Sequence, residues 1–91
     1  MIHWETRALK DREAIFDFLC DINPDVAIKT DDLIETKVEL LLRHPDLGVM
    51  RPPLPGRFLI IPDVSMIVLY TCREDDILIL RVLHQKQQFP A

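Results

Sequence analysis

The side chains that could hold or cut an anionic target gather near the end of the chain. Arg81 and His84 belong to an apolar run, and Lys86, Gln87 and Phe89 follow it. Cations placed around a scissile phosphate stabilise the charge that develops during RNA cleavage, and histidine is a common acid or base. The same groups could instead bind a partner without any reaction.

Three more residues extend this candidate set: Arg51 in a proline-rich stretch, Arg57 before an apolar run, and Tyr70 inside the next run. Two interpretations of Arg81 stay open, because arginine is rarely buried without a partner. It forms an ion pair with a helix carboxylate, or it lines a groove that binds an anionic target. For His84, a structural hydrogen bond and a role as a base are both open.

Other site chemistries find little support in the sequence. The three histidines stand at no ligand spacing with Cys, His, Asp or Glu, and two glycines cannot build a phosphate-binding loop. A single serine gives no basis for a nucleophile–base pair. We therefore predict no cofactor and no metal. Cys20 and Cys72 are expected to be reduced, buried thiols.

Length and composition predict one folded domain over residues 1–91, with 48% hydrophobic residues. The chain contains no apolar run long enough to span a membrane and no secretion signal, so we expect a cytoplasmic protein with no membrane partner. Residues 1–50 carry 6 basic and 11 acidic side chains, whereas residues 51–91 carry 5 and 4. An acidic front half disfavours general nucleic-acid binding.

The elements that must position the candidate residues are three apolar runs: 58–61, 66–71 and 77–84. Val, Ile, Leu and Tyr dominate them, and a Pro-Asp break and an acidic turn separate them, which predicts an antiparallel meander. Both faces of the third run are largely apolar. We therefore expect this strand to be central and covered on both sides.

The chain before the meander predicts one strand and two helices. Period-two alternation favours a strand over 1–4, and helical spacing favours helices over 6–21 and 24–43. Thr6 is expected to cap the first helix, and Asn23-Pro24 to start the second. The residues expected to face the core are Ala8, Ile15, Phe18, Leu19, Ile22, Ala27, Ile34, Val38, Leu41 and Leu42. Residues 45–55 contain four prolines and are expected to form a stiff, irregular loop.

The resulting order is β-α-α-β-β-β, an α+β fold with an N-terminal strand and a helical hairpin packed on a twisted antiparallel sheet. At this point the chain resembles the RelE/ParE superfamily of bacterial toxins. The resemblance is carried by ILRVLHQKQQFP, HPDLGVMRPPLPGRFLIIP and MIVLYTCREDDILIL, and it covers nearly the whole chain. It implies the same small α+β fold and the toxin half of a type II toxin–antitoxin module. It also implies a hetero-oligomer in which the C-terminal segment of a cognate antitoxin wraps the toxin.

The superfamily resemblance implies two alternative targets. RelE-like members cut mRNA on the ribosome with clustered basic residues, whereas ParE-like members inhibit DNA gyrase without being nucleases. Positions where the nucleases carry basic residues correspond here to Phe58, Ile60, Ile67 and Gln87. We therefore expect a ParE-like gyrase inhibitor that arrests growth. The alternatives are an mRNA endonuclease and a member that has lost toxicity and only binds.

The residues assigned under each alternative overlap. The residues expected to contact the target or the antitoxin are Arg51, Arg57, Tyr70, Arg81, His84, Gln87 and Phe89. The reduced active site of an endonuclease would consist of Arg57, Arg81, His84 and Lys86. The apolar stripes also exceed what 91 residues can cover, so we expect an apolar surface left for a partner.

Overall fold

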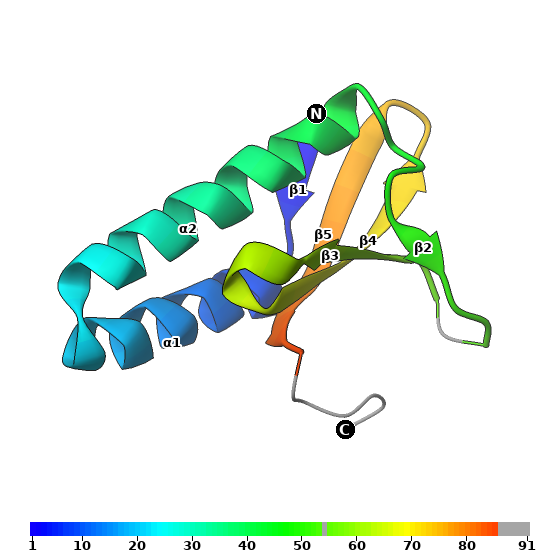
Figure 1. Ribbon diagram of the computed structural model, residues 1–91. Helices are drawn as coiled ribbons and strands as arrows, with labels where there is room; N and C mark the ends of the chain where they lie inside the picture. The colour runs from blue at the N-terminus through cyan, green and yellow to red at the C-terminus, as the bar shows by residue number, and fades with distance from the viewer. Residues whose placement is uncertain (54, 86–91) are drawn as a thin grey trace.

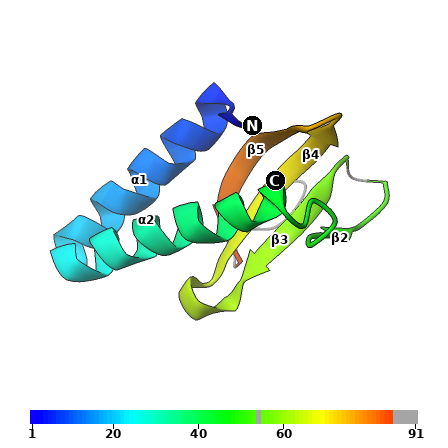
Figure 2. The same ribbon diagram turned by 90° about the horizontal axis from the view of Figure 1, so that it is seen from above.

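Two helices lie side by side on one face of a five-stranded sheet (Figures 1 and 2). This computed structural model describes residues 1–53 and 55–85. The strand order is β1-β5-β4-β3-β2. β1 pairs with β5 in parallel, and the other neighbours are antiparallel, so the sheet is mixed. The bounds of the strands are β1 Ile2–Trp4, β2 Val49–Met50, β3 Arg57–Ile61, β4 Met66–Arg73 and β5 Asp76–His84.

The helical hairpin consists of α1, Thr6–Ile22, and α2, Pro24–Glu39, followed by a 3-10 helix over Leu40–Leu42. The Asn23 side chain accepts the Asp25 N–H at 3.0 Å, and Pro24 occupies the first helical position. Both features allow α2 to start directly after α1 ends. The Asn23 side chain accepts one free N–H of the first turn of α2, and Pro24 has no N–H that needs a partner. The two helices are therefore held antiparallel by a one-residue link.

The core lies between this hairpin and the helix-facing side of the sheet. Period-two alternation sends every second strand residue to this side, and helical spacing brings the small and branched helix residues onto it. The fully buried members are Ala8, Ala27, Ile34, Val38, Leu41, Ile61, Val68, Tyr70, Ile79 and Val82. Burial of these side chains is the main force that holds the helices to the sheet.

Arg12 on α1 connects three elements on the other side of the hairpin. Its guanidinium donates to both Asp31 carboxylate oxygens on α2, at 3.0 and 2.8 Å, and to Glu35 at 3.3 Å. The same guanidinium lies 4.5 Å from the centre of the Trp4 ring on β1. Burial opposes the charged form, but the two carboxylates outweigh it and raise the pKa of Arg12. Through these contacts Arg12 links α1 to α2 and to β1.

Several expectations about the elements are confirmed, and several are wrong. The β-α-α-β-β-β order is as expected, but β2 adds a short strand inside the stretch expected to be irregular. Two residues of that stretch have a free β3 edge to pair with, which outweighs the prolines around them. Glu5, not Thr6, is the N-cap of α1, and it makes no side-chain capping hydrogen bond.

The expected helix faces also differ from the observed burial. Phe18, Ile22 and Leu42 are 66%, 69% and 51% exposed, although they share the apolar spacing. α2 stops at Glu39, because a 3-10 turn replaces its last predicted turn. Both helices lie on one face of the sheet, so β5 is not covered by a helix on both sides. Cys72 is exposed rather than buried. Within the described residues, no helix has the length and apolar character that a membrane span requires.

Candidate functional site

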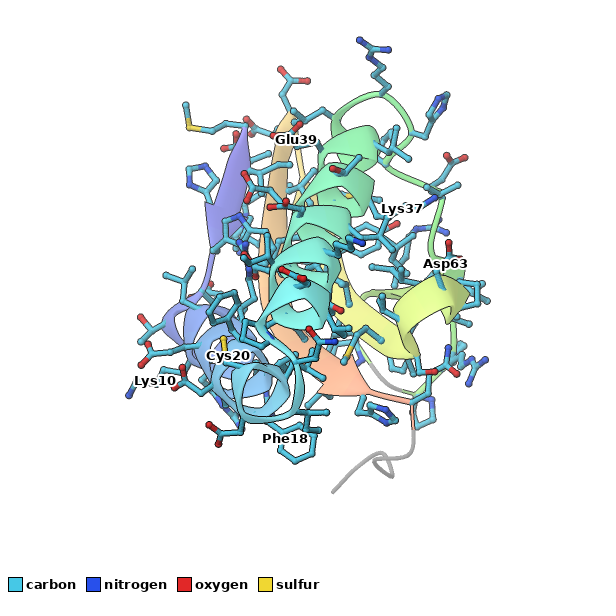
Figure 3. The ribbon with its side chains drawn as sticks, turned by 60° about the vertical axis from the view of Figure 1, so that its left-hand side comes forward. Lys10, Phe18, Cys20, Lys37, Glu39 and Asp63 are labelled. Atoms are coloured by element: carbon cyan, nitrogen blue, oxygen red, sulfur yellow. The ribbon has the colours of Figure 1, made fainter. Side chains whose placement is uncertain are left out.

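A groove of about 820 Å³ opens where the helical hairpin projects past the sheet. Its walls come from α1, α2, the turn before β4 and the end of β5. Figure 3 labels Phe18 and Asp63, which line it from the hairpin and from that turn. Most of the lining is apolar, with two acidic residues. The apolar members are Ala14, Ile15, Phe18, Leu19, Val26, Val64, Met66, Val82 and Leu83, and the acidic members are Asp11 and Asp63.

Exposure of the groove's apolar residues is high for a protein of this size. Phe18 and Val26 are 66% and 44% exposed, and Ile22 beside them is 69% exposed. Contiguous apolar surface of this kind marks an interaction site more often than a folding requirement. An apolar surface for a partner was expected from the sequence, but Phe18 and Ile22 were assigned to the core rather than to this surface. Its signal was present, since Phe18, Ile22 and Val26 recur every fourth residue across the link between the helices.

Arg81 is paired with Asp11, which lines the groove. Its Nε donates to Asp11 Oδ2 at 2.8 Å and its Nη2 to Asp11 Oδ1 at 3.1 Å. The Asp11 hydrogen bond raises the pKa of Arg81 and so favours its charged form. Of the two interpretations left open by the sequence, the ion pair with a helix carboxylate is the observed one.

Tyr70 on β4 and Arg57 on β3 together hold the chain between the 3-10 helix at Leu40–Leu42 and β2. The Tyr70 hydroxyl donates to the Pro45 carbonyl at 2.8 Å and accepts the Gly48 N–H at 2.7 Å. Arg57 Nη1 donates to the Gly48 carbonyl at 2.9 Å. Burial raises the pKa of Tyr70, so its hydroxyl remains neutral and can donate. These two residues support a backbone segment and do not face an open site.

Gly48 is where this segment comes closest to the sheet. A Cβ at Gly48 would stand 2.6 Å from Tyr70 Cε1 and 2.7 Å from the Tyr70 hydroxyl. Only a glycine lets the backbone approach the ring closely enough for its N–H to reach the hydroxyl oxygen. The sequence analysis did not single out Gly48, because a lone glycine in a proline-rich stretch carries no specific signal.

The expected site residues are therefore distributed over separate places. Arg57 and Tyr70 lie together under the segment before β2, Arg81 is bound to Asp11, and His84 lines the groove. Arg51 is exposed, and its guanidinium carbon lies 5.9 Å from the centre of the Phe58 ring. The remaining three, Lys86, Gln87 and Phe89, lie outside the described residues. Among residues 1–53 and 55–85, no three His, Cys, Asp or Glu side chains gather as metal ligands.

Comparisons with known proteins agree with one another. The family model described as "ParE toxin of type II toxin-antitoxin system, parDE" matches residues 2–89. The chain is 32% identical over 89 residues to "Putative toxin Y4kP" of Sinorhizobium fredii, covering 98% of this chain and 92% of the relative. A solved structure titled "Chromosomal ParDE TA system from P. aeruginosa" superposes with a TM-score of 0.76 at 28% identity. That match covers 91% of this chain and 92% of the other.

Proposed function

The chain belongs to the ParE family of toxins of type II toxin–antitoxin systems, and we propose that it arrests growth by inhibiting DNA gyrase in the cytoplasm. We also propose that a cognate antitoxin neutralises it by binding the groove between the helical hairpin and the end of β5. Family membership is the observation that carries both proposals. The geometry adds two supporting arguments, one for each.

The arrangement of the cations supports inhibition by binding rather than RNA cleavage. A nuclease needs several cations aimed at one phosphate, because each stabilises charge that appears only in the transition state. Here Arg57 on β3 donates to backbone carbonyls and Arg81 on β5 donates to Asp11, and β4 lies between these two strands. Redirecting either one would leave a partner carbonyl or carboxylate without its donor.

The chemistry of the groove supports the antitoxin as its occupant. Its apolar walls match the apolar face of a segment that folds as it binds, which is how a disordered tail gains affinity for a small protein. Asp63 adds negative charge to the lining, and Asp21 and Asp25 precede the exposed Ile22 and Val26 in the sequence. The segment that fits is therefore amphipathic, with basic side chains outside an apolar face.

The test is induced expression with and without the protein encoded beside the toxin. Gyrase inhibition predicts filamentation, a DNA-damage response and intact reporter mRNA, together with loss of supercoiling by purified gyrase in the presence of the purified chain. Co-expression of the neighbouring protein is expected to restore growth and to yield a stable complex. Rapid cleavage of the reporter mRNA with normal supercoiling would replace this proposal with the endonuclease alternative. Absence of growth arrest would indicate a member that only binds.

A further inference from the structure

The stretch from Leu42 to Arg51, here named the edge segment, forms an exposed surface at the far side of the molecule from the groove. Every residue in it is exposed except Gly48. In Figure 1 it descends on the right to β2, whereas the link between the helices lies on the left. Its exposed apolar members and their exposed fractions are Leu42 51%, Leu47 47%, Val49 52% and Met50 58%. Four such residues in one short segment exceed the scattered exposure of a surface without a partner.

The backbone of the edge segment is also open. β2 is the outermost strand and pairs only with β3, through Val49 with Phe58 and Met50 with Arg57. Its other side presents backbone donors and acceptors beside apolar side chains. Proteins usually protect such an edge with charges or prolines inside the strand. Neither residue of β2 gives that protection, although Arg51 and Pro52 directly follow it.

The edge segment is held in place from beneath. Tyr70 binds Pro45 and Gly48 at 2.8 and 2.7 Å, and Arg57 Nη1 binds the carbonyls of Gly48 and Asp46 at 2.9 and 3.5 Å. A surface fixed in this way loses little conformational entropy on binding, which favours affinity. Two side chains that could have faced a target are instead used to preorganise this backbone.

The edge segment and the two helices differ in the sign of their net charge. The segment carries Arg43 and Arg51 against one acid, Asp46, whereas α1 and α2 together carry nine acidic and five basic side chains. A basic, apolar patch on an acidic protein orients its approach to a negatively charged surface. Two arginines among four apolar side chains are too few to neutralise a nucleic-acid backbone and are typical of a protein interface.

We propose that the edge segment is the surface by which the toxin docks onto its target, and that the target presents an acidic protein surface with an apolar pocket. The inference rests on the proposed function, because it assumes that the chain acts by binding a target. It assigns that binding to the β2 edge and leaves the groove to the antitoxin. The toxin would then have two separate faces, one apolar with an acidic rim and one apolar with basic flanks.

The experiment compares two variants of the edge segment with two matched controls. Met50→Glu and Arg51→Glu reverse the chemistry of exposed positions, so both are expected to fold. Ile28→Glu and Lys29→Glu make the same changes at exposed positions of α2. Each variant is scored for growth arrest, for inhibition of supercoiling by purified DNA gyrase, and for binding to the antitoxin. Arg51→Lys, which keeps the charge, completes the set.

Both edge-segment variants are expected to weaken gyrase inhibition at least about tenfold, as loss of a central interface residue does. Antitoxin binding is expected to stay at the wild-type level, which shows that the variants are folded. The α2 controls and Arg51→Lys are expected to behave as the wild type does in all three assays. Growth arrest by Met50→Glu and Arg51→Glu at wild-type strength would overturn the inference.

Other occupants of the edge segment have their own signatures. If the wild type sediments as a dimer and Met50→Glu as a monomer with unchanged toxicity, the segment binds a second copy, and the inference is wrong. If the variants lose affinity for duplex DNA alone and still bind gyrase protein, the segment binds phosphate, and the inference is equally wrong. A wild type that arrests growth without affecting supercoiling refutes gyrase as the target. Growth arrest by the variants then still decides whether the edge segment docks the true target.

Discussion

Asp11 on α1 and Arg81 on β5, separated by 70 positions in the chain, meet at two points, 2.8 and 3.1 Å between heavy atoms. The same Asp11 Oδ2 accepts the backbone N–H of Val82 at 3.0 Å. β1 pairs with β5 only from Ile77 to Ile79, so Val82 lies on a part of the sheet edge that β1 does not reach. Asp11 therefore ties α1 to the sheet and occupies a donor that an added strand would need.

Replacement of Asp11 by alanine is expected to destabilise the protein by about 2 kcal/mol, since it leaves a partly buried guanidinium and a backbone N–H without their acceptor. Asp11→Asn keeps an oxygen that can accept the Val82 N–H, so the free energy of unfolding is expected to fall by about half as much. Urea denaturation measures the free energy of unfolding of both variants. The control is Asp17→Ala on the exposed side of α1, whose free energy of unfolding is expected to lie within about 0.5 kcal/mol of the wild type. Equal losses in the two Asp11 variants would contradict a role for the Val82 contact.

Removal of the Tyr70 hydroxyl is expected to loosen the edge segment. Tyr70→Phe keeps the buried ring but removes the hydroxyl that binds the Gly48 N–H and the Pro45 carbonyl. The free energy of unfolding is therefore expected to fall by about 1–3 kcal/mol. Hydrogen exchange should then speed up more at Gly48 than in β4 and β5, whose exchange follows only the loss of global stability. The proposed docking surface also depends on this bond, so gyrase inhibition should weaken while antitoxin binding holds. Unchanged exchange at Gly48 would show that Arg57 alone holds the segment.

The pKa of Tyr70 predicts a loss of stability at high pH. Burial raises the pKa of this phenol above its ordinary value of 10.0 in the folded protein. From about pH 10 upward the unfolded chain therefore releases a proton that the folded chain retains, and unfolding becomes easier. The stability advantage of the wild type over Tyr70→Phe should shrink there by at most about 1.4 kcal/mol per pH unit. Denaturation of both proteins across this range measures it.

The titration itself can be followed directly. Tyr70 is the single tyrosine in the chain, so the ultraviolet absorbance of its phenolate reports this group without overlap from another. In the folded protein the absorbance change is expected to lag behind that of the urea-unfolded chain as pH rises. A folded titration curve that coincides with the unfolded one would contradict the effect of burial on this pKa.

Local signals in the sequence were sufficient for most of the fold. Asn23-Pro24 predicts the start of α2 to the residue, because the Asn side chain and the Pro ring act on the backbone beside them. The three long strands were found because alternation and turn residues are also local. β2 was missed, since Val49 and Met50 become a strand only by pairing with Phe58 and Arg57, which no local pattern reveals.

The candidate site was harder to predict than the fold, for a physical reason. A cation's role depends on which carboxylate or carbonyl lies opposite, and those partners are distant in sequence: Asp11 for Arg81, and Gly48 for Arg57. Periodicity grouped Phe18 and Ile22 with the core residues of α1 but could not show that both are more than half exposed. Residue type and spacing thus gave candidate residues, and only the assembled sheet decided their contacts.

The groove gives the last prediction. Phe18→Asp in the groove and Ile22→Asp beside it place a carboxylate on a surface that we assign to the apolar face of the antitoxin, and each is expected to weaken antitoxin binding at least about tenfold. Both side chains are already more than half exposed, so the free energy of unfolding of the toxin alone should change by less than about 1 kcal/mol. Titration calorimetry of the purified pair measures the affinity.

Ile28→Asp is the matched control for these variants, since Ile28 is 50% exposed on α2 and does not line the groove. Its antitoxin affinity is expected to equal that of the wild type. The groove variants should also escape neutralisation in cells, because their edge segment is intact: growth arrest is expected to persist when the antitoxin is co-expressed. If Phe18→Asp and Ile22→Asp are neutralised as readily as Ile28→Asp, the antitoxin binds elsewhere, and the exposed apolar end of the hairpin has another role.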